Sequence, residues 1–214
     1  HLLSSVSNAR LFDEFCKIFL NGMAEKNFNK LVSFGLNKYL VSTNLNGCEF
    51  SNQLIIEALR NTDNRIKNNQ SVTPGFLIAA LLWPQLIKKS LKGNEINLKK
   101  FFRSMDSILR NQQKITAIPR KFHTYIKDIW VLQLKLHSRI GRQPYKTLKH
   151  PRFRAAYDFL LVREKAAAKT KDLGFWWTEF QKNNEDLKKK LINDLKKNNL
   201  EESSKIFGFS KELR

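Results

Sequence analysis

Hydrophobic residues recur every three or four positions along most of the chain, the spacing that places them on one face of an α-helix. One such stripe, Leu11 to Phe19, follows Asn8, a candidate N-cap, and stops before Gly22. Pro84 lacks an N–H and clashes with the preceding turn, so it is expected to kink or end its helix. Signals for a β-sheet are absent. The pattern predicts an all-α protein with helices over about 8–22, 25–34, 51–67, 74–82, 98–109, 119–134, 151–169, 173–182 and 185–199.

The large aromatic residues indicate where the core lies. Trp83, Trp130 and Phe101 fall on apolar helix faces, so we interpret them as core residues rather than as platforms for stacked bases. Trp176 and Trp177 are adjacent and are not expected to face one core together, so one of them should be partly exposed. Further core candidates at helical spacing are Phe28, Leu31, Val32, Leu98, Phe102, Met105, Ile108 and Leu109.

Positive charge is concentrated in one part of the sequence. The 214-residue chain has a formal net charge of +20, and about three quarters of it lies between Lys88 and Arg154. This window holds eighteen Lys and Arg against only Glu95, Asp106 and Asp128. Seven of the twelve arginines lie there, and arginine suits bidentate phosphate contacts and stacking on bases. A polyanion, and in the first place a nucleic acid, is the partner that this pattern predicts.

The sequence around each Lys and Arg in this window predicts which of them bind RNA. Some of the cations lie in a connection interrupted by Gly141 and Pro144, where a mobile basic loop can follow an RNA backbone without reading its sequence. Two others start a helix, where backbone N–H groups add to the attraction for phosphate. Asp158 stands four residues after Arg154 and is its candidate structural partner, and a solvated basic face without any ligand is the alternative. The predicted set is Arg120, Lys121, Arg139, Arg142, Lys146, Lys149, Arg152 and Arg154.

Motifs for catalysis or metal binding are not recognisable in the sequence. It contains no Gly-rich phosphate loop, no Gly-x-Ser-x-Gly, no His-Glu-x-x-His and no aspartate pair spaced to hold magnesium. His1, His123, His137 and His150 are scattered beside basic residues, so surface or phosphate-facing roles fit them better than a metal site. The sequence therefore predicts no metal site in this chain.

Two further features concern the compartment. Cys16 and Cys48 are too few for a disulfide framework and are expected to be small buried hydrophobes in a reducing compartment. The longest apolar run, residues 76–83, is far shorter than the roughly 20 residues that a membrane span needs. A soluble, cytoplasmic protein is the expectation.

Several stretches, in this order along the chain, are similar to the C-terminal part of bacterial poly(A) polymerases of the γ-proteobacterial type. They are TPGFLIAALLWP at 73–84, ITAIPRKF at 115–122, IWVLQL at 129–134, HPRFRAAYDFLLVR at 150–163 and FWWTEF at 175–180. Near the start, ARLFDE at 9–14 resembles the Arg-x-x-x-Glu neck motif that these enzymes share with CCA-adding tRNA nucleotidyltransferases. The resemblance covers about residues 1–182, and the stretches after Ile115 are specific to the poly(A) polymerases.

The resemblance implies a division of the chain and of the chemistry. Residues 1–47 would form a lower neck in which Arg10 and Glu14 brace the turn that presents the base-reading helix. Residues 48–182 would form an RNA-binding helical body, and 183–214 a basic C-terminal helix or tail. The catalytic head with its magnesium-binding carboxylates would precede His1. This chain is therefore expected to hold no catalytic residue and no cofactor, whereas the full-length enzyme would use ATP and Mg²⁺. The implied partners are single-stranded RNA 3′ ends, a DEAD-box helicase and other proteins of RNA decay.

Two alternative functions stay open at this point. A CCA-adding enzyme shares the neck motif but is not expected to carry the 115–180 stretches. A free-standing all-α RNA-binding or RNA-chaperone protein would account for the charge and the helices without any enzymatic half. A Gly-Ser motif with paired aspartates encoded directly upstream would favour the polymerase.

Overall fold

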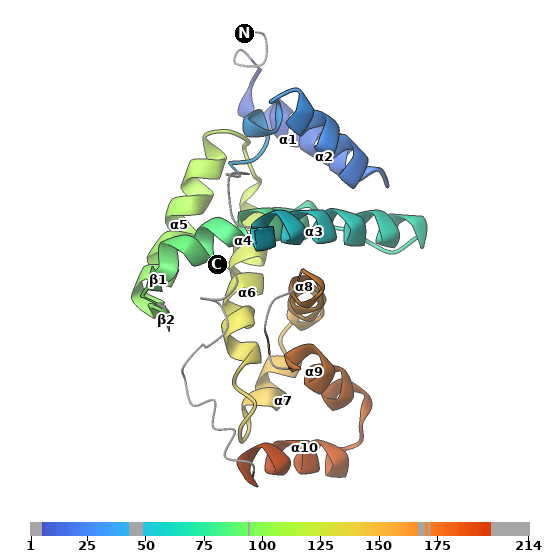
Figure 1. The fold of residues 1–214 in the computed structure, drawn as a ribbon, viewed down its shortest axis with the longest axis vertical. Coiled ribbons are helices and arrows are strands. Elements are labelled where there is room, and N and C mark those ends of the chain that lie inside the picture. The colour runs from blue at the N-terminus through green and yellow to red at the C-terminus, as the bar shows by residue number, and fades with distance from the viewer. Residues whose placement is uncertain (1–5, 43–48, 94, 167–169, 171, 198–214) are drawn as a thin grey trace.

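The computed structural model describes residues 6–42, 49–93, 95–166, 170 and 172–197, and within them the fold is helical except for one small hairpin (Figure 1). The hairpin pairs the two-residue strands β1 (Leu91–Lys92) and β2 (Glu95–Ile96) in antiparallel register. The all-α prediction is confirmed. The helices are α1 (Asn8–Phe19), α2 (Ala24–Ser33), the short 3₁₀ helix η2 (Asn37–Tyr39), α3 (Glu49–Lys67), α4 (Pro74–Ser90), α5 (Leu98–Gln113), α6 (Arg120–Leu136), α7 (Gln143–Leu148), α8 (Phe153–Lys165), α9 (Leu173–Lys182) and α10 (Glu185–Lys197).

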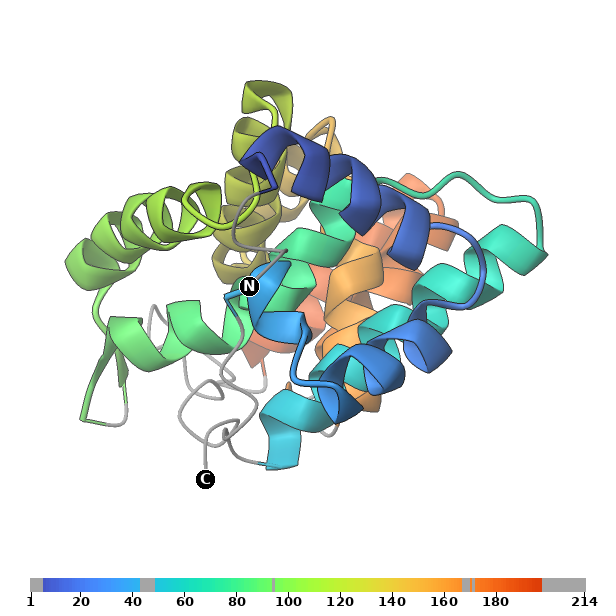
Figure 2. The ribbon, with the colours of Figure 1, turned by 90° about the horizontal axis from the view of Figure 1, so that it is seen from above.

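The helices are arranged around two hydrophobic clusters. The larger cluster joins α1, α2, α3, α4 and α5 with one end of α6 and part of α8. The smaller one joins the other end of α6 with the rest of α8, α9 and α10. In Figure 1, α5 and the hairpin lie on the left, α3 and α8 on the right, and α9 and α10 at the bottom; Figure 2 shows the same left-to-right order from above. Because α6 and α8 contribute to both clusters, the two parts are packed together through continuous helices.

Helix α4 is the centre of the larger cluster. Thr73 caps its start by accepting a hydrogen bond from the Phe76 amide, and Pro74 occupies the first turn, where its missing N–H costs nothing. The helix is buried almost all round, and the Trp130 indole donates to the Ala79 carbonyl at 2.9 Å. Pro84 does not end α4, which continues to Ser90, because Leu86 and Ile87 bury apolar surface in the core.

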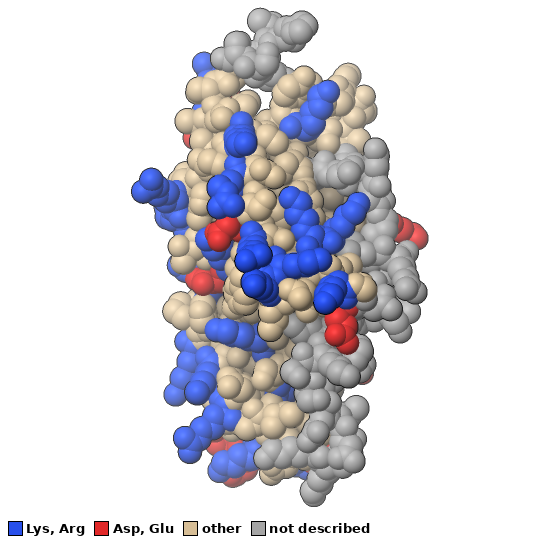
Figure 3. Space-filling model, turned by 90° about the vertical axis from the view of Figure 1, so that its left-hand side faces the viewer, with Lys and Arg blue, Asp and Glu red and all other residues tan. Residues whose placement is uncertain are grey.

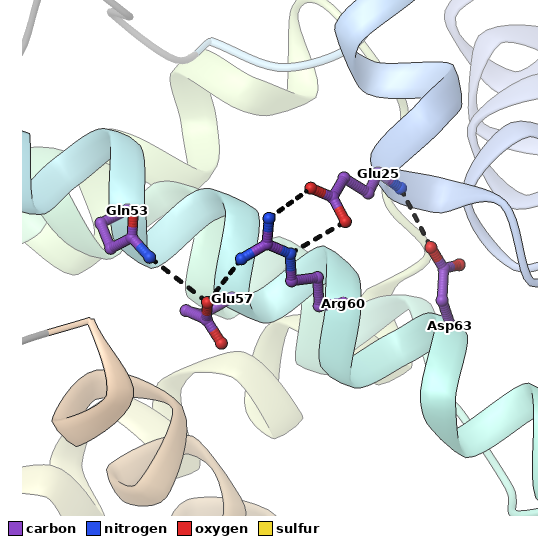
Figure 4. Close-up of polar contacts among 5 residues, drawn as sticks. All are labelled: Glu25, Gln53, Glu57, Arg60 and Asp63. Carbon is purple, nitrogen blue, oxygen red and sulfur yellow. Dashed lines mark hydrogen bonds and ion pairs between the residues drawn. The ribbon is translucent and has the colours of Figure 1, made fainter.

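Helix α2 is attached to α3 by polar contacts (Figure 4). The buried carboxylate of Asp63 accepts hydrogen bonds from the backbone N–H groups of Ala24, at 2.6 Å, and Glu25, at 3.1 Å. These groups open α2 and have no partner within it, so a residue 39 positions away serves as the cap. Arg60, one turn earlier in α3, forms ion pairs with Glu25 at 2.9 Å and Glu57 at 3.0 Å.

Replacing Asp63 with alanine is expected to lower the free energy of unfolding by about 1–3 kcal/mol, since two backbone donors lose a charged acceptor. Urea denaturation followed by circular dichroism measures the change. Asn52→Ala, an exposed substitution on the same helix, is the control and should leave the midpoint within experimental error. Equal midpoints for the two variants would contradict the capping role of Asp63.

The core predictions succeed for most residues and fail for a few. Trp83, Trp130 and Phe101 are fully buried, as predicted. Val32, Leu98 and Phe102 are exposed, because each lies at the edge of its helix stripe and no other described element covers it. The boundaries of the predicted neck, body and tail stay predictions.

The prediction for the tryptophan pair in α9 was wrong, since Trp176 is 7% exposed and Trp177 is fully buried. The Trp177 indole donates to the Leu136 carbonyl at 2.9 Å, which directs this ring towards α6. Trp176 stacks on Phe180 with centroids 4.8 Å apart, and the Arg139 guanidinium also lies over the Trp176 ring, 5.6 Å from its centroid. Helix α9 is thus covered on two sides, so adjacent residues both find packing partners.

Candidate nucleic-acid interface

Exposed cations gather on the side of the molecule formed by α5 and the hairpin. Figure 3 shows Lys and Arg side chains over much of this face, with few acidic ones. We call this surface the α5 face and define it by its exposed residues. They are Lys88, Lys89, Lys92, Lys99, Lys100, Arg103 and Arg110.

The sequence of α5 places these cations on one side. Phe101, Met105 and Ile108 are buried against the larger cluster, so the intervening positions face solvent. Asn97 caps the helix by accepting a hydrogen bond from the Lys100 amide at 2.9 Å. The cations at positions 99, 103 and 110 therefore follow one another along the exposed side of α5.

The acidic group on this helix is already paired. Asp106 forms an ion pair with Lys127 of α6, with 2.5 Å between Oδ1 and Nζ. Its negative charge is therefore shared between the cations of α5 and a cation of α6. Phe102 is 47% exposed beside the cations and offers an aromatic surface. The signal for the α5 face was present in the charge of the 88–154 window, but the predicted set left out its α4, hairpin and α5 members.

A second group of cations surrounds the beginnings of α6 and α8. Arg120 and Lys121 open α6, as predicted, and both are exposed. Arg152 and Arg154 are exposed at the start of α8. The Arg152 guanidinium lies 5.0 Å from the centroid of the Tyr125 ring, a distance at which a cation and an aromatic face attract each other.

The predicted partnership of Arg154 and Asp158 is present, with 3.1 Å between Arg154 Nε and Asp158 Oδ1. Arg65 of α3 also reaches this carboxylate, with 3.1 Å between Nη1 and Oδ2. Burial raises the pKa of Asp158 above its ordinary value, and Arg154 and Arg65 offset only part of this effect. Sequence reasoning missed Arg65 because it lies far outside the basic window and meets Asp158 only in the fold.

The cations of the predicted loop differ in exposure, and part of this loop is helical. Gly141 does interrupt the chain, with φ +61°, but 143–148 form the short helix α7. Arg142, Lys146 and Lys149 are exposed on or beside α7. The expectation that Arg139 is an exposed loop cation was wrong, since it is 7% exposed and covers Trp176.

Arg139→Ala is therefore expected to destabilise the fold, by about 0.5–2 kcal/mol for the cation–π contact, because the guanidinium packs on a buried ring. Arg142→Ala removes the same charge from an exposed position and is the matched control, with an unchanged melting temperature. Differential scanning fluorimetry compares the two variants. A fall in melting temperature for Arg142→Ala, or none for Arg139→Ala, would contradict this placement.

The neck residues do not form the pair that their spacing allows. Glu14 is bound by Lys17, with 2.9 Å between Nζ and Oε1. Arg10 is exposed and has no ion pair within the residues that the structure describes. The bracing role of Arg10 and Glu14 stays a prediction.

The histidines and cysteines do not assemble a site in the described part of the chain. No group of three His, Cys, Asp or Glu that suits a metal ion occurs among these residues. His123 is held by Gln113 and the Ile118 carbonyl, each at 3.2 Å, and His150 accepts a hydrogen bond from the Arg152 amide. Cys16 is half-buried rather than buried, and burial raises its pKa. His1 and Cys48 lie outside the described residues.

None of the described helices is both long enough and apolar enough to cross a bilayer.

Two family models match the chain. "Polymerase A arginine-rich C-terminus" matches residues 94–206, and "Probable RNA and SrmB-binding site of polymerase A" matches residues 1–43. The α5 face lies partly within the first match, and α1 and α2 lie within the second.

Curated relatives agree with these matches. Poly(A) polymerase I of Salmonella typhimurium is 34% identical over 205 residues, which cover 91% of this chain and 44% of the relative. The Escherichia coli O157:H7 protein of the same name is 35% identical with the same coverage, and that of Haemophilus influenzae is 34% identical over 203 residues. The chain thus spans less than half the length of these relatives. Since the arginine-rich model alone matches more than half of the chain, and the predicted resemblance is confirmed, this chain belongs to the poly(A) polymerase family.

Proposed function

We propose that this chain is the part of a poly(A) polymerase that holds the RNA 3′ end. The observation that carries the proposal is the α5 face, where exposed cations from α4, the hairpin and α5 gather with few acidic neighbours (Figure 3). Single-stranded RNA presents one phosphate per nucleotide, and a row of cations along a helix can follow that backbone. The exposed ring of Phe102 adds a surface on which a base can stack.

Binding of this kind has a measurable signature. Each phosphate that a cation neutralises releases counterions, so log affinity should fall linearly with log salt concentration, at about −0.7 per phosphate on a single strand. Backbone contacts read no sequence, so A-rich and mixed-sequence oligonucleotides should bind similarly. Fluorescence anisotropy at several salt concentrations tests both points. A flat salt response, or equal affinity for a neutral polymer, would overturn the electrostatic account.

The transfer reaction belongs, in this proposal, to the whole polymerase. The full-length enzyme would add AMP from ATP to RNA 3′ ends with Mg²⁺, and so mark transcripts for decay in the cytoplasm. This chain supplies RNA affinity, and we expect the purified chain to leave a labelled primer unextended with ATP and Mg²⁺. Clear extension of the primer by the pure chain would contradict this division of labour. The CCA-adding and free-standing alternatives have less support, since every relative named above is a poly(A) polymerase.

A protein partner is the finer part of the proposal. The family model over residues 1–43 names SrmB, and we propose that a DEAD-box helicase binds the first two helices. Met23, Val32 and Phe34 are exposed there, and Phe34 is 73% exposed. Phe34→Ala should weaken helicase binding in a pull-down with purified proteins, whereas RNA affinity should be unchanged.

A further inference from the structure

A cavity of about 210 Å³ is lined by residues of α3, α4, α6 and α8 and of the segment before α4. Helices α3 and α8 lie on the side of the molecule away from α5 (Figures 1 and 2). A second hollow of about 290 Å³ continues from it along α3 and α8 as far as Lys165. The two hollows share Asn61, Arg65, Arg154 and Asp158, so they form one depression, which we call the α3–α8 groove. Its first part is smaller than the roughly 300–1,000 Å³ of sites that bury a drug-sized molecule, so a ligand as large as a nucleotide would be only partly enclosed in it.

One wall of the groove is aromatic and held in place. Tyr125 and Phe76 line it, and the Arg152 guanidinium lies over the Tyr125 ring at 5.0 Å. A Cβ atom at Gly75 would lie only 2.8 Å from Tyr125 Cδ1, so the glycine permits the ring to rest against the α4 backbone. A planar base can stack on this ring by taking the place of the guanidinium. The displaced guanidinium, on the flexible Arg152 side chain, can then contact the attached phosphate.

The charge of the groove favours an anion. Arg65, Arg152 and Arg154 line it against one carboxylate, that of Asp158. Asp158 is already shared by Arg65 and Arg154, each at 3.1 Å. Arg152 has no carboxylate partner within the residues that the structure describes, so its charge is the one left for a ligand.

A hydrogen-bond donor is also left over at the junction of the two hollows. The Asn61 side chain lines both of them, and its Nδ2 is buried without an acceptor in the described structure. A buried donor without a partner costs about 1–3 kcal/mol, which an oxygen or ring nitrogen of a ligand would relieve by accepting its hydrogen bond.

We propose that the α3–α8 groove binds one nucleotide of the single-stranded RNA, with the base stacked on Tyr125 and its phosphate held by Arg152. The proposal rests on the RNA-binding function proposed above and deepens it, because it places an aromatic contact on a surface separate from the α5 face. The RNA strand would then bind the α5 face through nonspecific electrostatic contacts and the α3–α8 groove through one inserted base.

The test compares stacking with charge. Binding of an A10 oligonucleotide is measured across a salt series for the parent, Tyr125→Leu, Tyr125→Phe and Arg152→Ala. Tyr125→Leu should lose about 5- to 150-fold in affinity with an unchanged salt slope, since stacking is lost and no phosphate contact is. Tyr125→Phe should bind like the parent, and Arg152→Ala should flatten the slope by about 0.7.

The control is Tyr145→Leu, which removes a half-buried tyrosine that packs on Phe180, 5.3 Å between centroids, away from the groove. If Tyr125→Leu and Arg152→Ala both bind A10 like the parent, the groove proposal is overturned while salt-dependent RNA binding by the parent stands. If the parent itself does not bind A10, the function proposed above fails as well. Free AMP is the second ligand to be tested. If AMP binding depends on Tyr125 while A10 binding does not, the groove is a mononucleotide site and the proposal is overturned. Should Tyr125→Leu prove unfolded, the exposed Arg152→Ala variant decides the question.

Discussion

Replacing Trp130 with alanine is expected to lower the free energy of unfolding by about 3–5 kcal/mol, the range for truncating a large buried aromatic residue. Trp130 is fully buried at the end of α6 that joins the larger cluster. Its indole N–H donates to the Ala79 carbonyl at 2.9 Å, so the substitution removes a hydrogen bond between α6 and α4 as well as apolar area. A loss of this size is a large share of the stability of a typical domain.

Urea denaturation monitored by circular dichroism gives the midpoint and the slope for each variant. Phe175→Ala is the control, because that aromatic ring is 68% exposed and its removal should cost little. The Trp130→Ala variant should unfold at a much lower urea concentration than Phe175→Ala. Similar midpoints for the two would show that the α4–α6 contact is not central to the fold.

The core aromatics could be predicted because their information is local. Trp83, Trp130 and Phe101 stand at helical spacing among other apolar residues, and a helix buries the face that its sequence makes apolar. The same rule failed for Trp176, because it assumes one buried face per helix and α9 is covered on two sides. Spacing along one helix cannot say how many neighbours surround it.

The candidate site shows the same limit for charges. The density of Lys and Arg in the 88–154 window correctly indicated exposed basic surfaces, since most of these side chains point to solvent. The fate of Arg139 could not be read from the sequence, because the ring of Trp176 that it covers lies 37 positions further along the chain. Arg65 and Tyr125 also come together with Arg152 only through the packing of α3 and α6 on α8.

The α5 face and the α3–α8 groove make different demands on an RNA strand. The α5 face offers several exposed cations and one exposed ring, so its contribution should follow salt concentration. The groove offers a fixed aromatic wall, so its contribution should follow the presence of a base. Salt slope and base dependence therefore separate the two surfaces in one set of titrations.

The triple variant Lys99→Ala, Arg103→Ala and Arg110→Ala should bind single-stranded RNA about 100-fold more weakly than the parent at 0.1 M salt. Each lost phosphate contact lowers the magnitude of the slope of log affinity against log salt concentration by about 0.7, so three lost contacts lower it by about 2. Between 1 M and 0.1 M salt, a slope smaller by about 2 means that the variant gains about 100-fold less affinity than the parent. The three side chains are exposed, so the melting temperature should change little. Fluorescence anisotropy with oligonucleotides of several sequences should give the same loss for each, because phosphate contacts carry no sequence information.

The matched control removes the same three charges from the other end of the molecule, as Lys182→Ala, Lys189→Ala and Lys190→Ala in α9 and α10. If RNA followed the net charge of the whole protein, both triple variants would lose affinity and slope equally. If the RNA backbone binds along the α5 face, only the α5 triple variant should show a salt slope smaller in magnitude by about 2. Counterions are released only where cations contact phosphates. Equal salt slopes and equal affinities for the two variants would therefore contradict the placement of the RNA backbone on the α5 face.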